Sequence, residues 1–153
     1  MAAHKGVNIT NLDATPRVPA SSEQVHGVLR VWYDTYETSS FAVDDTVALA
    51  RMPAGSTIHD VILKADDLHG SSTLEVGDSD DPNRFISIVS TWNTAGQTQS
   101  MLGGSSKIAD GTTAAMTGVG YRYTTETDIL VKLTGNNAAD AKTISMWVYY
   151  TTD

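Results

Sequence analysis

The sequence predicts an all-β fold, an eight-stranded antiparallel sandwich of the jelly-roll kind with an extended N-terminal arm. Short apolar runs with a period of two recur along the chain, and Gly, Ser, Thr and Ala crowd the segments between them. Stretches long enough for a helix are scarce. A length of 153 residues suits one domain, and a hydrophobic content of 41% is enough for its core.

Residues 1–24 are expected to form the extended arm, and residues 25–153 the sandwich. The first segment carries Pro16 and Pro19 among polar residues and has little periodic apolar signal. Such a segment either frays as a terminus or becomes ordered only against a neighbouring subunit or a host surface.

The expected strands follow in order as eight apolar runs: 29–34, 46–52, 58–65, 73–76, 85–90, 121–124, 128–133 and 143–152. In the first run Val31 and Tyr33 are taken as the buried face, which puts Trp32 on the outer side. In the last run Trp147 also lies opposite the more apolar face. Turn residues separate the runs, notably Pro53-Ala54-Gly55 and Gly135-Asn136-Asn137.

The region 93–118 is the least regular part of the domain and is rich in Gly, Ser and Thr. A connection of this length inside a compact domain is unusual and is normally functional, disordered or built around a short helix. Met101, Leu102 and Ile108 are the apolar residues that would anchor it. Together with the large aromatic residues, this loop offers candidates for contacts between subunits: Trp92, Met101, Leu102 and Trp147.

The charge and composition exclude several classes of protein. A formal charge of −8 with scattered lysines disfavours a protein that tracks nucleic-acid phosphates. The absence of cysteine excludes disulfides and thiolate metal sites. No run approaches the roughly 20 apolar residues of a membrane span, and the first residues lack the apolar region of a signal peptide. We therefore expect a soluble protein synthesised in the cytoplasm.

The Gly77-Asp78-Ser79 block invites comparison with a serine hydrolase family, in which a histidine downstream serves as the base. All four histidines of this chain precede Ser79: His4, His26, His59 and His69. The hydrolase hypothesis is therefore disfavoured, and we expect neither enzymatic activity nor a cofactor.

The acidic turn offers a weak metal site, because Asp78, Asp80 and Asp81 could hold a hard cation such as Ca²⁺. The EF-hand pattern fails at Pro82 and Asn83. The favoured hypothesis is a turn in which aspartates accept bonds from nearby backbone N–H groups and Arg84 offsets their charge.

The segment 52–86 resembles small structural proteins of tailed bacteriophage particles. The resemblance rests on the turn at Pro53-Ala54-Gly55, the strand that ends in Ala65-Asp66-Asp67-Leu68, and the Gly-Asp-Ser-x-Asp-Pro-x-Arg-Phe pattern from Gly77 to Phe85. It covers about a quarter of the chain. Within that group the segment is most similar to capsid decoration, or cement, proteins.

The resemblance implies a β-rich module on the outside of the expanded head that stabilises the capsid by bridging subunits of the major capsid protein. It also implies a homo-oligomer, with a trimer favoured. From the charge and the lack of a long apolar run we expect that the protein binds neither nucleic acid nor a membrane. The residues of the arm that would then contact the capsid are Val7, Ile9, Leu12, Pro16, Arg17, Val18 and Pro19. An alternative, favoured by the aromatic residues, is a tail-fibre, baseplate or head-fibre module that binds a host glycan.

Overall fold

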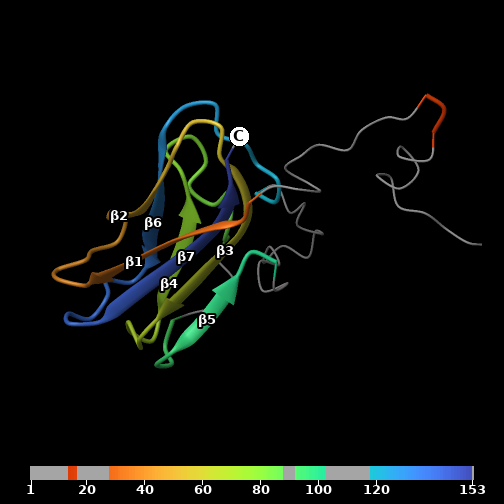
Figure 1. Ribbon diagram of the computed structural model, residues 1–153. Helices are drawn as coiled ribbons and strands as arrows, with labels where there is room; N and C mark the ends of the chain where they lie inside the picture. Colours follow the sequence, from red (N-terminus) through yellow and green to blue (C-terminus); the bar gives the residue numbers. More distant parts are fainter. Residues whose placement is uncertain (1–13, 17–27, 88–91, 103–117, 153) are drawn as a thin grey trace, which may run out of the picture.

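The computed structural model describes residues 14–16, 28–87, 92–102 and 118–152. These residues form seven strands in two antiparallel sheets that pack face to face (Figure 1). The strands are β1 (Arg30–Glu37), β2 (Thr46–Met52), β3 (Thr57–Ala65), β4 (Ser72–Gly77), β5 (Gln97–Ser100), β6 (Thr127–Gly135) and β7 (Thr143–Thr151). Within these ranges no helix is long and apolar enough to cross a membrane. The predicted all-β sandwich is confirmed, with seven strands rather than eight.

The order of the strands is that of a jelly roll with one outer strand reduced. One sheet has the order β1-β7-β3-β5 and the other β2-β6-β4. Beyond β4, Ile86 forms a single antiparallel bridge with Val76, at the place where a fourth strand would complete the second sheet. Counting this bridge as a strand gives the two four-stranded sheets of a jelly roll.

Three predicted details of the strands differ from the structure. Residues 85–90 were expected to form a strand, but among the described residues only Ile86 forms a bridge, and residues 88–91 lie outside the described ranges. Residues 121–124 contribute only the bridge between Arg122 and Thr57. Strand β5 was not predicted, because its four residues are all polar and only Gln99 is buried.

The core lies between the sheets and is built from alternate residues of the long strands. In β7 the side chains of Ile144, Met146 and Val148 are fully buried, while the residues between them are half-buried on the outer face. Strand β6 repeats this pattern with Ile129 and Leu133. Because full burial of one such side chain contributes about 1.5–3 kcal/mol, these period-two runs hold the sheets together.

The buried face of β1 is the reverse of the expected one. Val31 and Tyr33 are more than half exposed, whereas Trp32 and Tyr36 pack against the core. Alternation alone fixes which residues share a face but not which face is buried. On β1 the indole of Trp32 turns inward and bonds to Leu49 O of the other sheet, so the side chain of its neighbour Val31 lies on the outer face.

Both predicted turns are confirmed. Gly55 has a φ of 85°, and Ser56 N–H donates to Pro53 O at 3.1 Å, so the turn needs the left-handed conformation that glycine adopts freely. Gly135 ends β6 with a φ of 78° and packs closely against Ser71.

Candidate functional site

The outer face of the four-stranded sheet carries a surface that we call the aromatic face, formed by Val31, Tyr33, Ile62, Trp147 and Tyr149. The register places Tyr33 beside Trp147 and Trp147 beside Ile62, so three strands contribute to one row. The rings of Tyr33 and Trp147 lie 4.8 Å apart between centroids. Val31 is 52% exposed and Tyr33 is 55% exposed. Contiguous exposed apolar side chains of this kind mark binding surfaces more often than isolated ones do.

Leu102 extends this surface past the end of β5. Its N–H donates to Asp60 Oδ1 at 3.2 Å, and Asp60 pairs with Tyr149 across the sheet. The side chain of Leu102 is 50% exposed. Leu102 therefore lies beside Asp60 at the β5 side of the sheet, with the polar side chains of Asp60 and Ser100 next to it.

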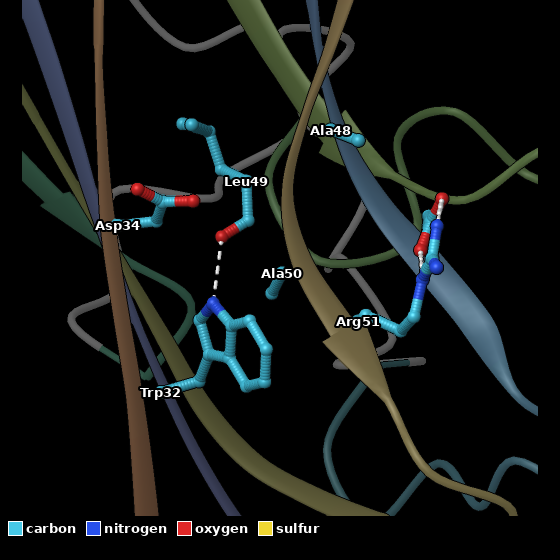
Figure 2. Close-up of a pocket in the computed structure, with 7 residues that line it drawn as sticks. Trp32, Asp34, Ala48, Leu49, Ala50 and Arg51 are labelled. Carbon is cyan, nitrogen blue, oxygen red and sulfur yellow. Dashed lines mark hydrogen bonds and ion pairs between the residues drawn. The ribbon is translucent and has the colours of Figure 1, made fainter.

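A pocket of about 280 Å³ lies at the seam where the edge of one sheet meets the edge of the other, and we call it the seam pocket. Figure 2 shows Trp32 and Asp34 of β1 facing β2, with a hydrogen bond from Trp32 Nε1 to Leu49 O of 3.0 Å. A register shift between Ala48 and Ala50 bends β2 at this point. The remaining lining residues are Arg51 and Asp128.

The rim of the seam pocket carries a bidentate ion pair. Arg51 Nε and Nη2 donate to the two carboxylate oxygens of Asp128 at 2.6 and 2.9 Å. These hydrogen bonds hold the pKa of Asp128 below its usual value. Arg51 is 61% exposed and Asp128 is 34% exposed, so solvent screens the pair and its contribution to the stability of the fold is small.

The acidic turn is organised by one buried carboxylate. Asp78 is 3% exposed and accepts hydrogen bonds from Arg84 Nε at 2.7 Å and from the hydroxyl of Tyr123 at 2.9 Å. It also accepts bonds from the backbone N–H groups of Asp80 and Asp81, both at 3.0 Å. This is the favoured arrangement of the sequence analysis, in which Arg84 and backbone N–H groups satisfy the turn.

The same network bears on the metal hypothesis. The oxygens of Asp78 already accept hydrogen bonds from four groups, namely Arg84, the Tyr123 hydroxyl and the N–H groups of Asp80 and Asp81. Among the described residues, no three His, Asp or Glu side chains gather in an arrangement that could hold a metal ion. The turn is built around the guanidinium of Arg84, whose carbon lies 4.0 Å from the ring centre of Tyr121.

We expect the stability of the protein to fall below about pH 4. Burial raises the pKa of Asp78, but the hydrogen bonds from Arg84, Tyr123 and Asp81 N–H together lower it below the usual value. A carboxyl group with a lowered pKa in the folded state stabilises the fold above its unfolded pKa, and this contribution is lost as the pH falls through the folded pKa. Urea unfolding from pH 7 to pH 2.5 measures the effect. The variant Asp78→Asn should lose this part of the pH dependence, and an unchanged profile would contradict the assignment.

The predicted contact residues fall into three groups. Leu102 and Trp147 lie on the surface described above, whereas Trp92 and Met101 are buried in the protein's own core, at 0% and 2% exposure. Of the arm residues, Pro16 is described and exposed. The others lie outside the described residues: Val7, Ile9, Leu12, Arg17, Val18 and Pro19.

The seam pocket was not predicted from the sequence. Its residues come from β1, β2 and β6, and nothing in their local patterns indicates that these strands meet. The exposure of Tyr33 was missed for a related reason, since it depends on which face of β1 turns inward.

The strand order and the exposed apolar residues define a jelly-roll protein with an apolar outer face on its larger sheet. No protein-family model matches the sequence, and no curated protein matches it. The fold is nevertheless shared with chains of phage capsids. A chain of the cyanophage Pam1 capsid asymmetric unit aligns over 100% of both chains, with 21% identity and a TM-score of 0.64.

Two further capsid chains have the same fold. A chain of the capsid of Ralstonia phage GP4 is 21% identical, with a TM-score of 0.58 over 84% of this chain and 86% of that one. A chain of the acid-stable capsid of Helicobacter pylori bacteriophage KHP30 is 12% identical, with a TM-score of 0.57 over 84% of this chain and 92% of that one. The resemblance to phage virion proteins is therefore confirmed at the level of the fold.

Proposed function

We propose that this protein is a structural component of a phage particle, and that it decorates the outside of the mature head by bridging subunits of the major capsid protein. The observation that carries the proposal is the match to a chain of the Pam1 capsid over the whole length of both chains. The alignment spans the full length of both chains, with a TM-score of 0.64. The resemblance of the segment from Pro53 to Phe85 to capsid decoration proteins also supports this proposal.

The charge of the chain supports a place on the exterior of the head. The sequence has 18 acidic and 10 basic residues, which gives a net charge of −8. A surface that lines the packaged DNA would need clustered cations to offset the phosphate charge. An acidic module with an exposed apolar face fits the outer surface, where its partners are protein subunits.

In the mechanism that we propose, the arm and the sandwich make different contacts. The arm, residues 1–24, lies across neighbouring capsid subunits, and the sandwich contacts other copies of the same chain. Many weak contacts of this kind, repeated over the lattice, give a large total stabilisation of the shell. A structural role of this kind needs neither catalysis nor a cofactor.

The copy number in purified particles tests this function. We expect about one copy for each major capsid subunit, because a decoration protein covers the head lattice. Quantitative mass spectrometry of particles of the parent virus measures the ratio. A few to a few tens of copies in each particle would instead identify a tail, vertex or fibre component.

One observation favours the alternative of a glycan-binding module. The rings of Tyr33 and Trp147 are in contact at a tilt of 33° and are partly exposed, and aromatic faces of this kind pack against sugar rings. A glycan array with reproducible hits that Trp147→Ala abolishes would support the alternative. Trp92 is unsuitable for this test, because its side chain is completely buried.

A further inference from the structure

We propose that two copies of the chain pair through the outer edges of their β1 strands, which no other described strand covers, antiparallel and centred on Trp32, to form one continuous eight-stranded sheet. The proposal deepens the homo-oligomer part of the proposed function by naming the surface and its symmetry. It is tested on the free protein and does not depend on binding to a capsid.

The backbone of β1 offers hydrogen-bonding groups at its outer edge. At the end of β1, Thr38 N–H donates to Lys142 O, and Ala141 N–H donates to Thr38 O, so Thr38 faces the neighbouring chain segment. In an antiparallel strand the residues alternate between the two sides, which turns the backbone groups of Val31 and Tyr33 away from β7. Thr35 N–H is turned the same way, and its bond to Asp34 Oδ1 of 2.8 Å agrees with this parity.

Pairing centred on Trp32 satisfies this parity. It places Val31 opposite Tyr33 of the second copy, so that two outward-facing residues exchange both backbone hydrogen bonds. Trp32 then lies opposite the second Trp32 as a pair without such bonds. A shift of the register by one residue would set outward-facing residues against inward-facing ones and break this match.

The same register is complementary in charge. Arg30 lies opposite Asp34 of the second copy, and the symmetry repeats this contact on the other side of the centre. Both residues are exposed in the single copy. Two molecules of net charge −8 repel each other, but the segment Arg30–Asp34 carries no net charge, so it is a place where two copies can approach.

Both faces of the pairing strand also gain contacts. On the outer side Val31 and Tyr33 of each copy meet, so the two aromatic faces join into one surface. On the inner side Asp34 lines the seam pocket, and the guanidinium of the second copy's Arg30 arrives at its mouth. Edge strands of natural proteins usually carry devices against such pairing, yet β1 is eight residues long and exposes apolar side chains.

A contact of this kind relates a surface to itself and has twofold symmetry. The free protein is therefore expected to be a dimer, in place of the trimer that the sequence resemblance implies. On a capsid, such a contact would link copies that belong to neighbouring lattice positions.

Cysteine cross-linking tests the register, since the natural chain contains no cysteine. The variants Arg30→Cys and Asp34→Cys are prepared separately and then mixed under mild oxidation. A pair without backbone hydrogen bonds has Cα atoms about 4.5 Å apart, which suits a disulfide. In either variant alone, the two cysteines would lie about 13 Å apart along the paired strands, too far to join. We expect a disulfide-linked dimer mainly in the mixture.

Charge reversal tests the same contact by sedimentation velocity. The variant Arg30→Asp sets Asp against Asp34 twice and should weaken dimerisation about tenfold or more. The double variant Arg30→Asp/Asp34→Arg should restore it. Lys64→Asp is the matched control, because it changes the net charge equally at an exposed site on β3 and should leave the dimer intact.

Two outcomes would overturn the proposal. One is a wild-type protein that sediments as a monomer or a trimer, and the other is cross-linking of equal yield in the single variants and the mixture. Either result would leave the capsid role standing, which the copy number in particles tests separately. Conversely, the free protein could sediment as a dimer while the particles contain only a few copies of it. That result would contradict the decoration role and leave the proposed dimer standing.

Discussion

Replacement of Asp78 by alanine is expected to lower the free energy of unfolding by about 3–5 kcal/mol, the range typical of a buried ion pair that loses one partner. The side chain of Arg84 is only 14% exposed and would keep its charge without the carboxylate that neutralises it. The hydroxyl of Tyr123 and the N–H groups of Asp80 and Asp81 would lose the same acceptor. Because small domains are stable by only about 5–15 kcal/mol, part of the protein would unfold at 37 °C.

Urea unfolding followed by tryptophan fluorescence measures this loss. Asp80→Ala is the matched control, since it removes the same group from an exposed position in the same turn and should change stability by less than about 0.5 kcal/mol. Equal effects of the two substitutions would mean that overall charge, and not the network around Asp78, determines the stability of the turn.

Deletion of residues 2–22 is expected to abolish binding to heads while the sandwich remains folded. Among the described residues, the first strand begins at Arg30 and the buried core at Phe41, and the described part of the deleted segment, residues 14–16, is exposed. If the arm supplies the contacts with the capsid, each copy loses most of its binding surface, and the loss is repeated over the lattice. Binding is measured by adding the purified variant to undecorated heads and determining its occupancy, with circular dichroism as the test of folding.

A shorter deletion, of residues 2–6, provides the control for the arm. It removes none of the proposed contact residues, the first of which is Val7, and should leave the occupancy unchanged. Full occupancy by the longer deletion would show that the sandwich alone binds the head, and the proposed role of the arm would then be wrong.

The sequence was sufficient to predict the strands that carry their own pattern. In β6 and β7, large apolar residues recur at every second position, and these positions form the buried face. The turns at Gly55 and Gly135 were predictable for the same local reason, because each needs a conformation that glycine favours. The acidic turn was also predicted correctly, since aspartates next to backbone N–H groups and one arginine leave few other arrangements.

The features that were missed depend on partners far away in the sequence. Strand β5 has no apolar pattern and exists because β3 offers it an edge, with Gln97 opposite Ala65. The inward orientation of Trp32 depends on Leu49, which accepts its hydrogen bond from the other sheet. The complete burial of Trp92 likewise results from the packing of the whole sandwich, and the sequence around this residue does not predict it.

The position of β7 has a consequence for the time at which the protein can fold. β7 lies between β1 and β3 and pairs with both, yet it leaves the ribosome after the other six strands of the described residues. Until Thr143–Thr151 has emerged, the nascent chain holds β1 and β3 without the strand that joins them, so the larger sheet cannot close during synthesis. Pairing of β1 with β7 spans more than 100 residues of chain, as the match of Arg30 with Tyr150 shows, and such distant contacts slow folding. Incomplete chains therefore expose the edges of β1 and β3, and exposed strand edges make such chains prone to aggregation until β7 is available.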